Sequence, residues 1–241
     1  LFRSGSVDML ILGIETATER VGVSIGGHEG VIASFQVTRG RCHAETLVPA
    51  IEFTCREADV TLPEIGAIAV DVGPGLFTGM RVGIATAKAM ASALEIPVVT
   101  STSLELLALP FVADERVIVS IVDARKGEVF FAMYRGEGRE VREVMAPSCG
   151  PIDAVVAAVQ DRGQSVLAVG DGARRYHDAL AADHRVEIAR DTFDHPSADT
   201  LVGLAHRRSL VEAWMAAEAV EAMYLRQPDA EINWTTRADK P

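Results

Sequence analysis

The sequence predicts an α/β protein built as two lobes, each with a mixed β-sheet flanked by helices. One observation is that the order strand–strand–strand–helix–strand–helix occurs twice along the 241 residues, with breaks near Pro110 and Asp114. The other is the spacing of the elements within each half. Strands in close succession pair as antiparallel hairpins, whereas a strand that follows a helix can pair in parallel. A sheet with both kinds of pairing, covered by helices, is therefore expected in each half.

The N-terminal lobe is expected over residues 9–110. Its first strand is a continuous apolar run, and a second apolar run follows within the reach of a hairpin. Pro49 lies inside the first expected helix and predicts either a kink or a later helix start. The expected strands are 9–14, 21–25, 31–37, 68–72 and 98–100, and the expected helices are 44–58, 79–94 and 103–109.

The C-terminal lobe is expected over residues 111–226, and its last helix is a candidate to return to the N-terminal lobe. The expected strands are 117–122, 129–134, 140–145 and 166–169, and the expected helices are 152–160 and 198–219. Residues 1–8 are interpreted as a leader or an expression remnant ahead of a natural start at Met9. Residues 227–241 are interpreted as a tail.

The expected helix 79–94 is unusual because it has little polar surface. It follows a Gly-Pro-Gly sequence at 73–75, which predicts a tight turn, and Thr78 is its expected N-cap. Small side chains recur at every fourth position, where two helix backbones could approach closely: these are Gly83, Ala87 and Ala91. A helix that is apolar nearly all round is buried on both sides. Its own sheet can cover one side, and a second helix or a second chain is needed on the other.

Composition narrows the class of protein. The net charge is −11, which argues against a protein that binds nucleic acid alone, because phosphate binding needs a basic face. The three cysteines show no metal or disulfide spacing, so a reduced, cytoplasmic protein is expected. No apolar run approaches the roughly 18 residues that span a bilayer, and no membrane association is predicted.

Acidic side chains at strand ends are the first candidate site. Glu15 and Thr16 close the first strand and could hold a metal-bound phosphate, although the residues by themselves favour a solvated hairpin. Asp71 and Asp123 also lie at strand ends. These two and Glu15 could converge on a divalent ion, or they could be ordinary turn residues.

The known catalytic signatures are missing from the sequence. The loop at 73–79 lacks the Gly-Lys-Ser/Thr of a phosphate-binding loop, and the glycine turn Gly170-Asp171-Gly172 carries a negative charge. The six histidines have no metal-helix spacing, and His43 is interpreted as a cap or surface residue. The G-x-S-x-G turn of serine hydrolases is also missing. No catalytic residue, metal or cofactor is therefore predicted.

Three segments together resemble the TsaB (YeaZ) family. Residues 11–16 read ILGIET, residues 43–49 read HAETLVP, and residues 73–83 read GPGLFTGMRVG. The last is the most specific, because a GPG-x-FTG-x-R-x-G string of this length is improbable by chance. Residues 123–129 and 224–226 add to the match. The resemblance is strong from residue 9 to about residue 108 and looser beyond.

This resemblance implies the two-lobed fold of actin and the sugar kinases (the ASKHA, RNase H-like type). It also implies a non-catalytic subunit that pairs with the catalytic subunit TsaD in bacterial tRNA threonylcarbamoyladenosine synthesis. The ATPase TsaE is an expected partner in the assembled complex, and tRNA is expected to be bound only through that complex. The isolated protein is expected to form a homodimer. The competing hypothesis is an enzyme of the same fold, either an ATP-dependent phosphotransferase or a metallopeptidase-like protein.

Comparison with TsaD implies that the ancestral active site is degraded. TsaD carries an HxxxH metal pair where this chain has Ser103 and Leu107, and neither can replace an imidazole ligand. The turn that contacts phosphate in the second lobe of relatives is here 124–127, with long side chains in place of glycine. The residues assigned to the degraded nucleotide site are Glu15, Thr16, Asp123, Arg125, Gly170, Asp171 and Gly172.

In this family the subunits pair through helices of the N-terminal lobe, which correspond to 44–58 and 79–94. A four-helix contact is therefore expected, with two helices from each partner and close approach along the small residues. The alternative is that helix 79–94 is enclosed within its own lobe. The residues assigned to the partner interface are Leu47, Val48, Ile51, Phe77, Met80, Arg81, Gly83, Ile84, Ala87, Lys88 and Ala91.

Overall fold

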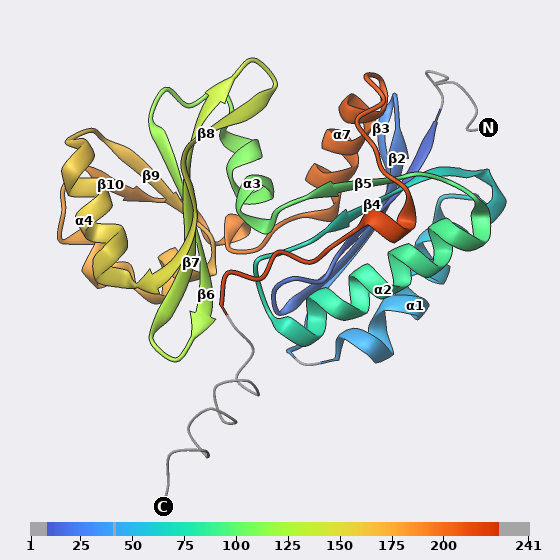
Figure 1. Ribbon diagram of the computed structural model, residues 1–241, viewed down its shortest axis with the longest axis horizontal. Coiled ribbons are helices and arrows are strands. Elements are labelled where there is room, and N and C mark those ends of the chain that lie inside the picture. The colour runs from blue at the N-terminus through green and yellow to red at the C-terminus, as the bar shows by residue number, and fades with distance from the viewer. Residues whose placement is uncertain (1–8, 41, 227–241) are drawn as a thin grey trace, which may run out of the picture.

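A computed structural model describes residues 9–40 and 42–226, and the expected leader (1–8) and tail (227–241) lie outside the described residues. It contains two five-stranded sheets with the orders β3-β2-β1-β4-β5 and β10-β9-β6-β7-β8. Each sheet has an antiparallel meander of its first three strands, followed by two parallel strands. When the second order is read in the opposite direction, its strands follow one another as those of the first sheet do. The predicted duplication is therefore confirmed (Figure 1).

The first sheet is covered on both faces. Its strands are β1 (Leu10–Glu15), β2 (Arg20–Gly27), β3 (Gly30–Thr38), β4 (Ile65–Asp71) and β5 (Val98–Ser101). Helices α1 (His43–Glu57) and α2 (Phe77–Leu94) lie on one face, and α7 (Ala198–Ser209) lies on the other (Figure 1). Adjacent residues of β1 show the alternation: Ile14 faces Gly83 of α2, whereas Gly13 faces Val202 of α7. The central strand β1 is therefore buried on both sides.

The second sheet is covered in the same way. Its strands are β6 (Val117–Arg125), β7 (Glu128–Glu137), β8 (Glu140–Pro151), β9 (Val166–Val169) and β10 (Val186–Ile188). Helix α3 (Ser103–Ala108) packs on the face toward the first lobe. The opposite face is covered by α4 (Ile152–Arg162), α5 (Asp171–Arg175) and α6 (His177–Ala181). Short 3₁₀ segments occur at Leu62–Glu64, Leu109–Phe111, Asp191–Phe193 and Ala217–Ala219.

The prediction of one long last helix over 198–219 is wrong. Helix α7 ends at Ser209, and the chain turns and continues as segment 215–226, which contains the 3₁₀ turn Ala217–Ala219 and which we call the strap. The strap begins with two backbone hydrogen bonds between Met215 and Val98 at the edge of β5, each 2.9 Å long. Ala217 and Val220 are then buried in the core of the first lobe. Pairing with a free sheet edge satisfies the backbone groups that a longer helix would have paired internally.

The starts of α1 and α2 test two details of the prediction. Helix α1 starts at His43 and has Pro49 inside it, so of the two predicted alternatives, a kink or a later start, the later start is wrong. His43 is buried and is not a surface residue. Its Nε2 lies 2.7 Å from the carbonyl oxygen of Thr18. Helix α2 starts at Phe77 without a side-chain cap, so Thr78 is not its N-cap. Its entry is set by Leu76, whose N–H donates to the carbonyl of Ala17.

Candidate functional site

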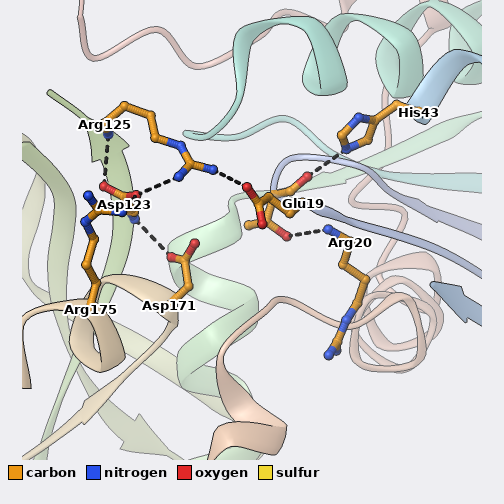
Figure 2. A network of polar contacts seen from close by, with 8 residues as sticks. Glu19, Arg20, His43, Asp123, Arg125, Asp171 and Arg175 are labelled. Carbon is orange, nitrogen blue, oxygen red and sulfur yellow. Dashed lines mark hydrogen bonds and ion pairs between the residues drawn. The ribbon is translucent and has the colours of Figure 1, made fainter. Parts of the chain in front are cut away.

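The turns of two equivalent hairpins face each other where the lobes meet. The β1–β2 turn belongs to the first lobe, and the β6–β7 turn belongs to the second (Figure 2). Duplicated topology places both turns at the same end of their sheets, so residues far apart in the sequence come together there. Facing turns with free polar groups could hold a small charged ligand, so the partners of these side chains decide what the site can bind.

A guanidinium group occupies the space between the acidic side chains of the two turns. Arg125 Nη1 lies 3.1 Å from Asp123 Oδ2, and Arg125 Nη2 contacts Glu19 Oε1 from the other lobe (Figure 2). Arg175 Nη1 reaches the same Asp123 oxygen at 3.3 Å. Asp123, with only 4% of its side chain exposed, is therefore paired with two cations.

The turn that carries Arg125 has an unusual backbone. Arg125 and Lys126 both adopt left-handed conformations, with φ of 65° and 56°. Such conformations favour glycine, and each costs a residue with a Cβ roughly 1 kcal/mol. The turn tolerates this cost at the position where relatives were expected to have glycine. The arginine at this position supplies a long cationic side chain that contacts Glu19.

The predicted glycine turn of the second lobe lies beside this network. Asp171 Oδ1 accepts a hydrogen bond from the Asp123 N–H at 2.9 Å, and burial raises the pKa of Asp171 to about 6. A Cβ at Gly170 would lie 2.2 Å from the Ile121 carbonyl oxygen, and Gly172 is packed against the same residue. These two glycines therefore allow α5 to pack closely on β6.

Glu15 and Asp71 form a separate, buried pair of acids. They end the neighbouring parallel strands β1 and β4, whose register places Ile14 beside Val70. Asp71 accepts hydrogen bonds from the Gly73 N–H (2.7 Å) and from Ser103 Oγ (2.8 and 2.9 Å). Glu15 Oε1 accepts from the Ala17 N–H, whereas Oε2 is buried and has no hydrogen-bond partner among the described residues.

The environment of this pair favours the protonated form. Burial, followed by the charge of Asp71, raises the pKa of Glu15 well above its usual range. Burial also raises the pKa of Asp71, to about 7. The predicted convergence of Glu15, Asp71 and Asp123 on one ion is thus not observed. Among residues 9–40 and 42–226, no group of three or more His, Cys, Asp or Glu side chains could hold a metal ion.

Other predicted site residues point elsewhere. Thr16 Oγ1 donates to the Gly79 carbonyl at 2.9 Å, which ties the β1–β2 turn to α2. Leu107 is in the core of the second lobe and also borders a cleft of about 420 Å³ between the lobes. Sequence reasoning missed Arg20 and His195, which line the same cleft. Burial, with a smaller effect of Arg20, lowers the pKa of His195 to about 4.

The small stripe of α2 faces its own sheet. A Cβ at Gly83 would lie 2.2 Å from Thr16 Oγ1, and Ala87 and Ala91 are buried in the first core. The expectation that these three residues line a partner interface is therefore corrected. The residues assigned to the interface but buried in the chain's own core are Leu47, Ile51, Met80, Gly83, Ile84, Ala87 and Ala91.

The outer faces of α1 and α2 remain accessible. Val48, Phe77 and Arg81 are exposed, as is a second series of small residues that the prediction missed, Ala85 and Ala89. The buried small residues and the exposed ones recur with the same spacing of four, so the sequence alone could not show which series faces the sheet. The strap covers one flank of α2, where Lys88 Nζ donates to the carbonyls of Glu218 (3.2 Å) and Val220 (3.0 Å). The chain's own fold therefore covers the inner side and one flank of α2 and leaves its outer side exposed.

Comparisons with known proteins agree with this architecture. Residues 33–234 match the family described as "TsaD: tRNA N6-adenosine threonylcarbamoyltransferase". The "tRNA threonylcarbamoyladenosine biosynthesis protein TsaB" of Bacillus subtilis is 25% identical over 94% of this chain and 98% of its own length. An uncharacterized protein of Mycobacterium tuberculosis is 35% identical over 92% and 93% of the two chains.

Solved structures give the same result for the fold. YeaZ from Pseudomonas aeruginosa has a TM-score of 0.74 and 25% identity, and the match covers 90% of this chain and 100% of that one. The fold is of the actin and sugar-kinase type, as predicted. Within the part of the chain that the structure describes, no helix is long and apolar enough to cross a membrane.

Proposed function

The chain belongs to the TsaB (YeaZ) family, and from this premise we propose that it is a non-catalytic subunit in the biosynthesis of N6-threonylcarbamoyladenosine in tRNA. Its role is to bind and activate a TsaD catalytic subunit. TsaE is its further partner in the assembled complex, and tRNA reaches it only through that complex. In the absence of its partners the protein forms a homodimer. It is located in the cytoplasm.

The observation that carries the non-catalytic assignment is the position of Arg125. A metal-bound phosphate needs carboxylate oxygens that are free to take the metal. Here the Asp123 carboxylate is already paired with Arg125 and Arg175, and Arg125 also contacts Glu19 of the other lobe. A metal ion would have to displace two guanidinium groups before a nucleotide could be held between the turns.

The exposed face of α1 and α2 supports a role in binding a partner. It presents apolar Val48 on α1 and, along one side of α2, apolar Phe77 and the small side chains of Ala85 and Ala89. Small side chains let a second pair of helices approach, and aromatic and arginine side chains are enriched where protein partners meet. We define this face by Val48, Phe77, Arg81, Ala85 and Ala89 and call it the helical face.

The test of the helical face is the affinity for TsaD. Val48→Glu places a charge on the α1 part of this face, and the affinity, measured by calorimetry, should fall at least 10-fold. Val211→Glu is the matched control, because Val211 is exposed just beyond the end of α7, the helix on the opposite face of the sheet. Unchanged binding by Val48→Glu, with unchanged thermal stability, would contradict the proposed interface.

The test of the non-catalytic assignment uses the isolated chain and the reconstituted complex. Titration of the chain alone with ATP and Mg²⁺ should give neither stoichiometric binding nor turnover. Modification of tRNA by TsaD and its companion proteins should require this chain and should survive Arg125→Ala. Turnover of ATP by the chain alone would favour the competing enzyme hypothesis instead.

A further inference from the structure

The tripeptide Tyr224-Leu225-Arg226 connects three parts of the molecule. Tyr224 Oη accepts a hydrogen bond from Arg81 Nε on α2 at 3.1 Å. Leu225 packs against the core of the second lobe. Arg226 Nη1 donates to the Ala124 carbonyl (2.9 Å) and to Glu128 (3.1 Å), beside the β6–β7 turn. The strap therefore brings the aromatic side chain of Tyr224 onto the start of α2.

Arg81 lies over the ring of Phe77 and beside the ring of Tyr224. Its guanidinium carbon lies 3.8 Å from the centre of the Phe77 ring and 5.9 Å from that of Tyr224. The two ring centres are 5.6 Å apart. All three side chains are exposed to solvent. Stacking on aromatic faces fixes the plane of a guanidinium group, so the direction of its N–H donors is fixed as well.

The terminal nitrogens of Arg81 are available to a partner. Within residues 9–40 and 42–226, the only hydrogen bond of the guanidinium group is the one from Nε to Tyr224, and it has no ion pair. Other arginines at the surface are paired with carboxylates, including Arg116, Arg174 and Arg185. Arg81 thus has a fixed orientation, unused donors and no acid of its own chain.

We propose that Arg81, oriented by Phe77 and Tyr224, is the docking point for an aspartate or glutamate side chain of the partner subunit. This inference rests on the proposed function, because it specifies the chemistry of one contact on the helical face. A planar guanidinium group matches a carboxylate through two parallel N–H donors. Tyrosine and arginine are also the residue types that contribute most to binding at protein interfaces. The strap becomes a third element of the interface, besides α1 and α2.

A protein carboxylate fits this position better than a nucleic-acid phosphate. Arg81 lies at the start of α2 on the helical face, next to apolar Phe77. The chain as a whole has a net charge of −11, which disfavours the broad basic surface that phosphate backbones require. A single oriented guanidinium group in an apolar and aromatic setting is suited to one acid in a partly dry interface.

The experiment measures the affinity of full-length variants for TsaD by calorimetry at low and high salt. Arg81→Ala and Tyr224→Ala should weaken binding about 10-fold, and Tyr224→Phe, which keeps the ring, less than 3-fold. Arg81→Lys should also lose at least 5-fold, because a lysine keeps the charge but not the planar fork. Arg81→Glu should be rescued by replacing one aspartate or glutamate of TsaD with arginine. Thermal unfolding of each variant checks that the strap stays in place.

The outcomes separate this inference from the proposed interface. If Arg81→Ala binds within 2-fold of the wild type while Val48→Glu loses binding, the helical face stands and the carboxylate contact is wrong. If both variants bind normally, the proposed interface fails, and this inference fails with it. If Arg81→Ala binds TsaD normally but weakens retention of tRNA by the assembled complex, the group recognised is a phosphate, and the inference is overturned.

Discussion

Arg125 of the second lobe forms an ion pair with Glu19 of the first lobe, joining side chains 106 residues apart in the sequence. The same guanidinium group contacts Asp123, so one side chain neutralises acids from both lobes (Figure 2). The relative position of the two β-hairpin turns is therefore set in part by a cation that the chain itself provides.

This ion pair should make a small, measurable contribution to stability. Both side chains are 43% exposed, and half-exposed pairs contribute about 0.5 to 1 kcal/mol. A double-mutant cycle of Arg125→Ala and Glu19→Gln, followed by urea unfolding, should give a coupling free energy in that range. The more exposed pair Arg56–Glu57 is the control and should give a value near zero. A coupling near zero for Arg125 and Glu19 would show that the pair does not hold the lobes.

The buried acids should make the protein less stable as the pH rises. Asp71 has a folded-state pKa of about 7, against an ordinary value of 3.8, and the pKa of Glu15 is also raised. The folded state therefore holds protons that the unfolded state has released above about pH 4. Their contribution is fully present below that pH and is lost as the pH rises toward 7 and beyond. The free energy of unfolding should thus fall between pH 5 and pH 8.

Glu15→Gln tests this source of pH dependence. The substitution keeps the shape of the side chain and removes the charge, so it should flatten the pH profile. At pH 8 it should raise the free energy of unfolding, because the buried side chain no longer has to be ionised or to hold a proton. Asp161→Asn, at an exposed position of α4, should leave the profile unchanged. A parallel profile for Glu15→Gln and the wild type would contradict the role of this pair.

Two helical glycines should respond to alanine in opposite directions. A Cβ at Gly83 would clash with Thr16 Oγ1 and disturb its hydrogen bond to Gly79. Gly83→Ala should therefore lower the free energy of unfolding by about 2 kcal/mol. At Gly203 of α7 a Cβ would meet only Arg207 Nη1, at 3.8 Å, so Gly203→Ala should add up to about 1 kcal/mol. Urea unfolding of both variants measures this, and equal effects would mean that α2 does not pack this closely on β1.

A partly buried ion pair should hold α7 against the first lobe. Arg208 Nη2 lies 2.5 Å from Glu105 Oε1, and its Nη1 donates to the Thr100 carbonyl at 2.7 Å. These side chains are only 24% and 17% exposed. Arg208→Ala should cost about 2 kcal/mol, because it removes the only cation paired with a shielded acid and the side-chain donor to the Thr100 carbonyl among the described residues. Arg56→Ala, at a side chain that is 69% exposed, should cost less than about 0.5 kcal/mol. Similar losses for the two variants would contradict the assignment.

Much of the fold could be predicted because it depends on local patterns. The apolar runs that form β1 and β4 and the glycine turn ahead of α2 identify themselves over a few residues. The strap after Ser209 and the 3₁₀ turn within it could not be predicted in this way. Their conformation depends on the edge of β5 and on a place in the first core for Ala217 and Val220, and neither is visible in the local sequence.

The candidate site was predicted in part. Glu15, Asp123, Arg125 and Asp171 were all singled out, but their pairing was not. Glu19, at a turn, and Arg175, at the end of α5, were missed, because charged residues at such positions are usually solvated and nothing in the neighbouring sequence indicates a partner. The small stripe of α2 was recognised, but its direction was assigned to a partner rather than to β1.

The sequence by itself determined the duplicated order of elements, the family and the conformation of the Gly73 turn, because apolar periodicity, motifs and glycine conformations are local properties. Only the tertiary structure decided which stripe of α2 faces outward, that Arg125 spans the lobes, and that Tyr224 lies on Arg81. Each of these is a contact between residues distant in the chain, set by how two sheets and their covering helices pack together. Such contacts depend on the whole core, and no short segment encodes them.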